Sequence, residues 1–175
     1  INELSFYVFS TENWKRSLSE IKNLFDLIEE YYQEFEVTAQ NYNLKIRHYG
    51  SRKKLSKKIL NIIDNVTKKT KNNSSTAINL VFNYGGRDEI VSSFKKIKSG
   101  KINKINITNN LYTSLSKDPD LIIRTGGEMR LSNFMLWQSA YSELYFTKKL
   151  WPDFNITDLK KIIINFKKRK RNYGM

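Results

Sequence analysis

The sequence of 175 residues contains no cysteine and only one histidine, His48. Without cysteine the chain forms neither a disulfide framework nor a thiolate metal site, and this composition fits a reducing compartment. No apolar run approaches the roughly 20 residues of a transmembrane helix, and the sequence given contains no signal-peptide pattern. We therefore expect a cytoplasmic protein of one domain, with His48 as a hydrogen-bonded strand or loop residue and not a catalytic one.

Negative charge is also scarce. The chain has 31 Lys and Arg against 17 Asp and Glu, and its formal net charge is +14. Such an excess favours an acidic partner, namely phosphate groups, an anionic lipid surface or nucleic acid. However, the chain is rich in lysine, asparagine and isoleucine throughout, so a general drift in composition that leaves solvated lysines explains most of the charge. No helix-turn-helix, zinc-finger or RNP-type motif supports a nucleic-acid-binding protein.

Short apolar segments alternate along the chain with segments of helical period. Strands are expected where apolar and aromatic residues cluster between polar ones, namely in residues 1–10, 44–49, 77–84 and 120–124. Helices are expected where apolar residues recur every three or four positions, namely after the Ser17–Glu20 capping box, around residues 55–66, over 87–98 and over 155–171. The alternation predicts an α/β fold with a mainly parallel central sheet flanked by helices.

The connections between these elements are polar. Residues 71–75 are expected to form a loop, and Ser99–Asn110 is expected to be irregular. The NYGGR turn, Asn83–Arg87, is expected to be structural, because its glycines let the chain turn after a strand.

The segment Arg124–Leu144 follows an aliphatic strand with a glycine turn that carries cations. Open α/β sheets bind anionic ligands at such places, outside the carboxyl ends of their strands. The guanidinium groups of Arg124 and Arg130 fit phosphate oxygens, and Ser132 is expected to cap a following helix whose free N–H groups also favour an anion. These residues predict a diphosphate site with a metal ion held by Glu143. The alternative for Glu143 is a surface or ion-paired glutamate.

A second polar turn follows the first predicted strand and precedes a helix. Ser10 and Arg16 are candidates to hold phosphate oxygens, and Asn13 is a candidate to position a reacting group or a proton. Trp14 offers an apolar, π-rich face to a hydrocarbon or carbocation. The alternative is that Glu12 and Asn13 only satisfy the backbone of the turn and that Trp14 packs in the core. The location at a strand end favours a functional role.

Four motifs together resemble the cis-prenyltransferase family, in particular the undecaprenyl diphosphate synthases. They are FSTENWKR, NYGGRDEI, LIIRTGGEMRLSNFMLWQSAYSELYFT and LWPDF. The resemblance covers nearly the whole chain, in the order and spacing of the family.

The resemblance implies a cytoplasmic enzyme that adds isopentenyl diphosphate repeatedly to an allylic diphosphate, usually farnesyl diphosphate. Its product would be a Z-polyprenyl diphosphate such as undecaprenyl diphosphate, a cell-wall precursor lipid. It also implies a hydrophobic tunnel for the growing chain, Mg²⁺ as cofactor and a homodimer that binds no nucleic acid. Peripheral contact with the membrane is expected through the basic last helix.

The resemblance also implies roles for individual residues. It assigns Asn13 as the catalytic proton acceptor and Glu143 as a magnesium ligand. Substrate binding is assigned to Ser10, Thr11, Glu12, Trp14 and Arg16 in the first turn and to Arg124, Arg130, Leu131 and Ser132 in the second.

Two departures from the family pattern qualify these expectations. The DGNGRWA-type phosphate loop with its aspartate does not occur in residues 1–175, and Met129 stands where some relatives have a metal-binding histidine. We therefore expect residues 1–175 to form a single cis-prenyltransferase domain that lacks its N-terminal strand and phosphate loop and is inactive by itself. The alternatives are a truncated, non-catalytic subunit of the same family and, from another class, a basic nucleic-acid-binding protein.

Overall fold

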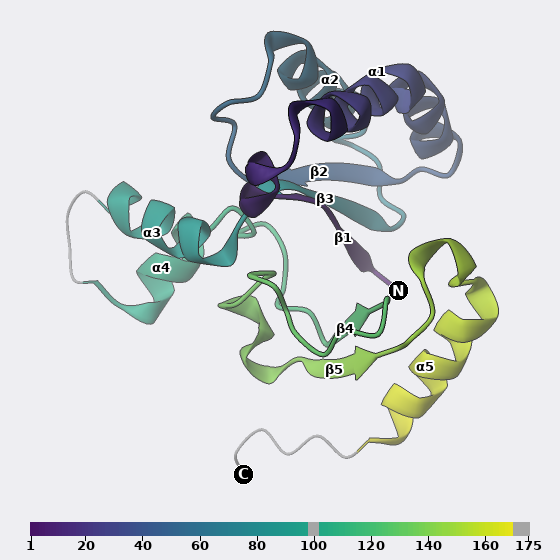
Figure 1. The fold of residues 1–175 in the computed structure, drawn as a ribbon. Helices are drawn as coiled ribbons and strands as arrows, with labels where there is room; N and C mark the ends of the chain where they lie inside the picture. The colour runs from purple at the N-terminus through teal and green to yellow at the C-terminus, as the bar shows by residue number, and fades with distance from the viewer. Residues whose placement is uncertain (98–101, 170–175) are drawn as a thin grey trace. The chain divides into compact units, whose positions relative to one another are not determined.

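The predicted alternation of strands and helices is present in the structure, a computed structural model that describes residues 1–97 and 102–169 (Figure 1). The chain divides into two units, Ile1–Ser116 and Lys117–Met175, and each contains a parallel sheet. The predicted α/β fold class is therefore confirmed. The expectation of a single domain stays a prediction.

The sheet of the first unit consists of β1 (Glu3–Ser10), β3 (Ala77–Tyr84) and β2 (Lys45–Tyr49), in this spatial order and all parallel. β3 lies in the middle, and its apolar run is buried almost throughout, as expected for a central parallel strand. The register of β1 against β3 shifts between Tyr7 and Phe9, and Phe9 is only 2% exposed. The aromatic side chain just before the last residue of β1 therefore lies in the core.

Two helices, α1 (Leu18–Asn41) and α2 (Lys57–Lys69), cover one face of this sheet (Figure 1). The predicted capping box at the start of α1 is confirmed. The N–H of Glu20 donates to Ser17 Oγ at 3.3 Å, and the N–H of Ser17 donates to the Glu20 carboxylate at 3.2 Å. The main core cluster beneath the helices comprises Phe9, Ile21, Leu55, Ile59, Ile62 and Phe82.

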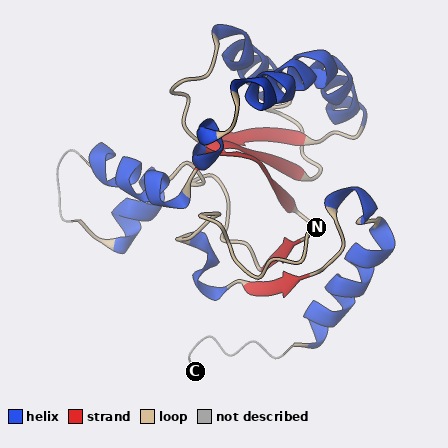
Figure 2. Cartoon of the chain, viewed as in Figure 1, coloured by secondary structure: helices blue, strands red, loops and turns tan. Residues whose placement is uncertain are grey.

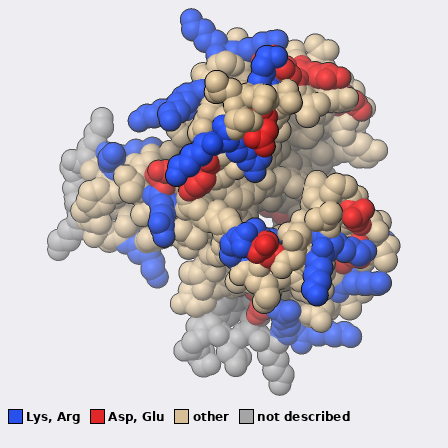
Figure 3. Space-filling view, viewed as in Figure 1, with Lys and Arg blue, Asp and Glu red and all other residues tan. Residues whose placement is uncertain are grey.

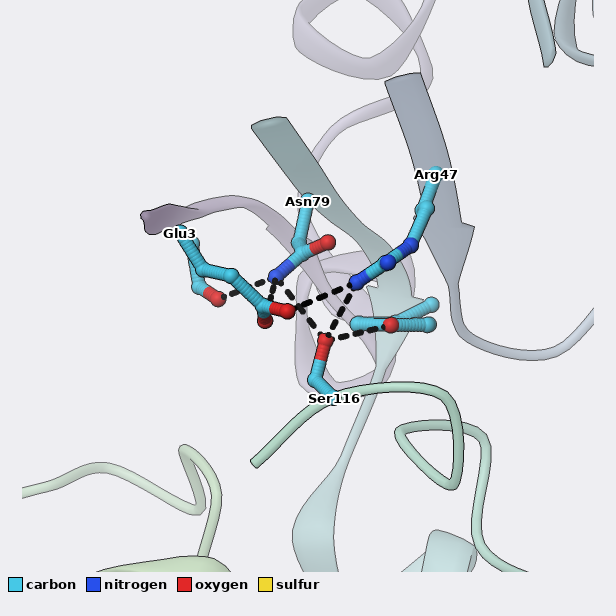
Figure 4. A network of polar contacts seen from close by, with 6 residues as sticks. Glu3, Arg47, Asn79 and Ser116 are labelled. Atoms are coloured by element: carbon cyan, nitrogen blue, oxygen red, sulfur yellow. Dashed lines mark hydrogen bonds and ion pairs between the residues drawn. The ribbon is translucent and has the colours of Figure 1, made fainter. Parts of the chain in front are cut away.

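The other face of the sheet carries a network of polar side chains (Figure 4). Arg47 Nη1 donates to Glu3 Oε1 and to Ser116 Oγ, each at 3.0 Å. The Ser116 hydroxyl also accepts a hydrogen bond from Asn79 Nδ2 at 3.3 Å and lies 2.6 Å from the Tyr49 hydroxyl. The network therefore fixes Ser116, the last residue of the first unit, against the three strands.

The segment after β3 forms two helices, α3 (Gly86–Lys96) and α4 (Lys104–Asn110), which pack on each other. The expectation that residues 99–110 are irregular is wrong for α4, and the part of that segment before residue 102 lies outside the described residues. Asn103 caps α4 by accepting a backbone hydrogen bond at 2.8 Å, and the Ser93 hydroxyl in α3 donates to a backbone carbonyl of α4 at 2.6 Å. Contact with α3 thus outweighs the weak helix propensity of the asparagine-rich sequence.

In the second unit, β4 (Leu121–Arg124) and β5 (Glu143–Phe146) pair in parallel. The 3-10 helix η3 (Trp151–Asp153) leads to α5 (Ile156–Lys168), which is capped by Asn155 through hydrogen bonds of 2.9 and 3.2 Å. The predicted helix ends at residues 98 and 171 lie outside the described residues. In the described part of the chain, no helix is both long enough and apolar enough to cross a membrane.

Candidate functional site

The turn after β1 is a 3-10 helix, η1 (Thr11–Lys15), capped by Ser10. The N–H of Ser10 donates to Asn13 Oδ1 at 2.9 Å, and the N–H of Glu12 donates to Ser10 Oγ at 3.1 Å. The Ser10 hydroxyl in turn donates to the Glu12 carboxylate. Asn13 and Glu12 therefore do satisfy the turn, as the structural alternative expects, and the role of Asn13 as proton acceptor stays a prediction.

Trp14 joins this turn to the core. Its ring meets Phe9 and Phe25 edge to face, with centroid distances of 5.3 and 5.7 Å. The indole Nε1–H donates to Asn83 Oδ1 at 2.8 Å. Trp14 therefore packs in the core as the structural alternative expects, and its contact with a substrate stays a prediction.

Thr11 and Arg16 have different surroundings. The Thr11 hydroxyl donates to Asp88 Oδ2, in the first turn of α3, at 2.8 Å. Arg16 is exposed, and within residues 1–97 and 102–169 no carboxylate lies within ion-pair distance of its guanidinium group. Arg16 is therefore available to an anionic ligand.

The turn lies at the carboxyl end of the sheet, where Ser10 is in register with Tyr84. Gly50 follows β2 with φ 152°, and a Cβ at this position would lie 2.0 Å from the carbonyl oxygen of Phe82. The strand ends therefore approach each other as closely as glycine allows. This is the edge at which open α/β sheets bind their ligands.

The NYGGR turn at the end of β3 depends on its asparagine. Asn83 has φ 53°, whereas Gly85 has φ −149° and Gly86 is the first residue of α3. The left-handed conformation in this turn therefore belongs to Asn83, and Gly85 is in an extended conformation. Asparagine tolerates the left-handed region better than other residues with a side chain do.

In the second unit, the loop after β4 brings Arg124, Arg130 and Ser132 together. Arg124 Nη1 donates to Ser132 Oγ at 2.7 Å and also to the backbone carbonyl of Arg130. Arg130 pairs with Glu128, and 61% of the Arg130 side chain is exposed. Leu131 is partly buried between them. Two guanidinium groups and a hydroxyl on one loop are suitable donors for a diphosphate.

The helix predicted after Ser132 is absent. Ser132, Asn133 and Met135 have φ angles of 48°, 65° and 43°, which right-handed helices exclude. Figure 2 shows loop between β4 and β5, apart from one short 3-10 helix, η2 (Gln138–Tyr141). Ser132 therefore caps no helix, and its hydroxyl accepts a hydrogen bond from Arg124 instead.

Glu143 is the first residue of β5, and its carboxylate accepts a hydrogen bond from Arg169 Nη1 at 2.6 Å. The ion-paired alternative is thus what the structure shows, and magnesium binding stays a prediction. Met129, at the position of a metal-binding histidine in some relatives, is 77% exposed and offers only a weak thioether ligand.

These residues fit one kind of magnesium site. The described residues contain no group of three or more histidine, cysteine, aspartate or glutamate side chains that could hold a metal. Mg²⁺ commonly uses one or two carboxylates together with substrate phosphates and waters. Glu143 fits that arrangement, in which phosphate oxygens complete the coordination.

His48 is a hydrogen-bonded strand residue, as expected, and it is partly buried. Its Nε2 lies 3.0 Å from the carbonyl oxygen of Phe82, and burial lowers the pKa of the imidazole, so the neutral form is favoured.

A cavity of about 410 Å³ lies between α1, α2 and the sheet. Its lining is almost wholly apolar and includes Leu27, Ile28, Phe35, Ile59, Ile62 and Leu80. The sequence predicted a hydrophobic tunnel only through the family resemblance, and none of these residues was assigned to it. Each fits a core position equally well, so periodicity alone could not separate cavity lining from core.

Comparisons with known proteins agree with this geometry. Residues 1–174 match the protein family described as "Putative undecaprenyl diphosphate synthase". Isoprenyl transferase of Treponema denticola is 46% identical over 175 residues, which cover 98% of this chain and 77% of that protein. Isoprenyl transferase of Aquifex aeolicus is 39% identical over 177 residues, with 99% and 77% coverage.

Two solved structures share the fold. The crystal structure of a probable undecaprenyl diphosphate synthase from Campylobacter jejuni matches with a TM-score of 0.93 and 38% identity, over 100% of this chain and 84% of that one. Lavandulyl diphosphate synthase from Lavandula x intermedia, solved in complex with dimethylallyl diphosphate, matches with a TM-score of 0.94 and 29% identity, over 100% and 80%.

Proposed function

Because the chain belongs to the undecaprenyl diphosphate synthase family of isoprenyl transferases, we propose that it condenses isopentenyl diphosphate repeatedly onto an allylic diphosphate. Farnesyl diphosphate is the proposed starter, and the product is a Z-polyprenyl diphosphate lipid carrier such as undecaprenyl diphosphate. Family membership makes the protein a prenyltransferase. The particular substrates and the product are what we propose.

One observation carries this proposal: in the first unit the polar turn packs on side chains that also line an apolar cavity. Trp14 of η1 packs on a core cluster that contains Ile59, Ile62 and Phe82, and these three residues also line the cavity. A ligand with an anionic head and a hydrocarbon tail matches this combination. Prenyl diphosphates have this chemistry.

The proposed roles in diphosphate binding follow from the donors of each turn. Arg124, Arg130 and Ser132 hold the diphosphate of isopentenyl diphosphate through charge-assisted hydrogen bonds. To do so, Arg130 exchanges its ion pair with Glu128 for phosphate oxygens. Arg16 influences the Glu20 carboxylate by its charge but forms no ion pair within residues 1–97 and 102–169, so it binds a substrate phosphate without such an exchange.

The reaction develops negative charge on the leaving diphosphate and positive charge on the allyl unit. Guanidinium groups stabilise the diphosphate, and the face of Trp14 stabilises the allyl cation. Asn13 is a weak base, and its Oδ1 is occupied by the N–H of Ser10. As proton acceptor it therefore passes the proton on to phosphate or water.

We propose Mg²⁺ as the cofactor, with Glu143 as its protein ligand. When bound, the ion neutralises charge on the phosphate oxygens. Glu143 leaves Arg169 to take this role, so the arginine becomes free for a phosphate oxygen at the same time.

We also propose that the enzyme is a cytoplasmic homodimer. In the first unit, α3 exposes Val91 and Phe94, each 52% exposed, and α4 exposes Ile105, 69% exposed. Apolar residues of this size on adjacent helices favour contact with a second copy. Sedimentation equilibrium checks this, and a monomer at all micromolar concentrations would contradict it.

For the membrane, we propose peripheral contact through α5. This helix exposes Ile156 and Ile164, and its last turn contains Lys167 and Lys168. Exposed apolar residues beside lysines favour an anionic lipid surface. Cosedimentation with vesicles containing phosphatidylglycerol, but not with purely zwitterionic vesicles, is the expected result.

Nucleic acid is not among the proposed partners. On the face shown in Figure 3, lysine and arginine side chains are scattered and interspersed with acidic ones. Such a surface supports only weak binding to duplex DNA or RNA that is lost as salt rises. A tight, sequence-selective complex at physiological salt would contradict this proposal.

The decisive experiment is incorporation of radiolabelled isopentenyl diphosphate in the presence of farnesyl diphosphate, with and without a chelator of Mg²⁺. We expect Mg²⁺-dependent formation of a long polyprenyl product. If the full-length protein binds isopentenyl diphosphate without incorporating it, the alternative of a non-catalytic subunit is supported instead. If it neither binds nor incorporates it, the proposed function fails.

A further inference from the structure

Asn83 is a buried residue that connects three segments of the first unit. It is 2% exposed, and its Nδ2 donates to the backbone carbonyls of Ser51 and Lys53, both at 2.8 Å. Its Oδ1 accepts the indole N–H of Trp14 at 2.8 Å. The segment after β2, the end of β3 and η1 therefore meet at one side chain.

The orientation of this amide is determined by its partners. Carbonyl oxygens accept hydrogen bonds and cannot donate them, so the NH₂ group must face Ser51 and Lys53. The Asn83 carbonyl oxygen is then the only atom that can face Trp14. The backbone holds the side chain in place as well, because the N–H of Ser51 donates to the backbone oxygen of Asn83 at 2.9 Å.

The hydrogen bond from Trp14 to Asn83 fixes the orientation of the indole ring, which the aromatic contacts alone do not. The edge-to-face contacts of Trp14 with Phe9 and Phe25 favour a particular tilt of the rings, but they do not select which edge of the indole carries the N–H toward the strand end. A hydrogen bond requires a particular edge of the ring at a particular distance. Asn83 thereby fixes Trp14 within η1, the turn that runs from Ser10 to Arg16.

We propose that Asn83 is a positioning residue for the substrate turn, acting through Trp14 on the groups that contact the prenyl diphosphates. This inference rests on the proposed function. The NYGGR motif then does more than turn the chain: its asparagine both adopts the left-handed conformation and orients the site.

The test compares Asn83→Gly and Trp14→Phe with their double variant in the full-length protein. Glycine accepts φ 53° without strain, so Asn83→Gly removes only the side chain. Trp14→Phe retains one six-membered aromatic ring and removes the N–H donor together with part of the indole. The matched control is Asn43→Gly, because Asn43 has φ 52° but lies exposed after α1, with its side chain bonded to Ser74.

Two readouts separate positioning from stability. The first is kcat and KM for both diphosphates, measured at a temperature at which every variant is folded. We expect each single variant to lower kcat/KM about tenfold, a typical effect of one hydrogen bond. The double variant should lose less than the two single losses multiplied together, because both substitutions remove the same hydrogen bond, and Asn43→Gly should match the parent.

The second readout is hydrogen exchange of the Trp14 indole N–H by NMR, which needs no turnover. We expect exchange about tenfold faster in Asn83→Gly than in the parent and in Asn43→Gly. If Asn83→Gly melts at a lower temperature but keeps the parental kcat, KM and indole exchange, Asn83 is only structural and the proposal is overturned. If the parent itself forms no prenyl product, the proposed function fails, whereas unchanged indole exchange would overturn the role of Asn83 independently.

Discussion

The turn after β1 and the loop after β4 both follow a parallel strand and both contain predicted substrate residues, but different interactions hold them. The turn is held by hydrogen bonds, both neutral ones such as those from Ser10 to Asn13 and from Trp14 to Asn83 and ones to the carboxylates of Glu12 and Asp88. In the loop and the strand after it, ion pairs dominate: Arg130 with Glu128 and Glu143 with Arg169.

This difference has a physical consequence for ligand binding. The hydrogen bonds within the packed turn remain when a ligand binds, so the turn has its binding conformation before the ligand arrives. Exposed ion pairs contribute little to stability, and phosphate oxygens or a metal ion can replace one partner of each. We therefore expect substitutions in the turn to act mainly on stability and substitutions in the loop to act mainly on binding.

The largest expected effect is on stability, from Trp14→Ala. Removing a packed tryptophan leaves a cavity and costs about 3 kcal/mol of unfolding free energy. The control is Trp151→Ala in the second unit, since Trp151 is 62% exposed and its loss should cost well under half as much. Urea denaturation followed by circular dichroism measures both, and equal losses would remove the distinction between the two regions.

The next largest effect is on binding, from Arg124→Ala. Loss of a charge-assisted contact worth roughly 1.5–3 kcal/mol weakens affinity for an isopentenyl diphosphate analogue about ten- to a hundredfold. Arg52→Ala is the control, because Arg52 pairs with Asp64 at the surface and has no assigned role in binding. Calorimetric titration of both variants checks this, and parental affinity in Arg124→Ala would refute the assigned diphosphate site.

Several elements follow directly from the sequence. The central strand β3 has the predicted bounds, because its apolar run is long and ends at polar residues on both sides. The start of α1 is also as predicted, since the Ser17–Glu20 capping box is a local signal. The placement of Ser10 and Arg124 at strand ends follows from the same pattern. Features that depend only on residues close together in the sequence, such as strand bounds and helix caps, can therefore be predicted.

Other features depend on contacts that sequence spacing does not contain. Ser132, Asn133 and Met135 adopt left-handed conformations although none is glycine, so the apolar period of that segment wrongly predicted a helix. α4 forms because it packs on α3, not because its residues favour helix. Trp14 and Asn83, which are joined by a hydrogen bond, lie 69 residues apart in the sequence. The only local signal for Asn83 was an asparagine just before a glycine turn at a strand end.

A smaller effect is expected for the metal. Glu143→Gln should raise the Mg²⁺ concentration needed for half-maximal turnover roughly tenfold, the lower end of what loss of a ligand-shell interaction costs. Asp64→Asn is the matched control, because Asp64 is also a carboxylate paired with an arginine. Superimposable magnesium titrations of Glu143→Gln and the parent would show that the Arg169 pair is the whole role of Glu143.

The smallest effect is expected for Glu3, which pairs with Arg47 on the polar face of the sheet in the first unit. Burial alone raises the pKa of Glu3, but hydrogen bonds from Ser116 and Arg47 and the charge of Arg47 outweigh it and hold the pKa below the usual 4.5. Because the folded pKa is the lower one, the ionised carboxylate stabilises the fold above pH 4.5, and this stabilisation is lost as the pH falls through the folded pKa. A partly exposed pair of this kind contributes about 0.5–1 kcal/mol.

We therefore expect Glu3→Gln to lower the unfolding free energy by this amount at pH 7 and by less at pH 3, because pH 3 lies below 4.5, where the stabilisation is progressively lost. Glu30→Gln is the control, because Glu30 is exposed on α1 and should change the unfolding free energy equally little at both pH values. Denaturation curves at pH 7 and pH 3 measure the difference. If Glu3→Gln costs the same at both pH values, neutral hydrogen bonds to Asn79 and Ser116, and not the charge of Glu3, hold this face of the sheet.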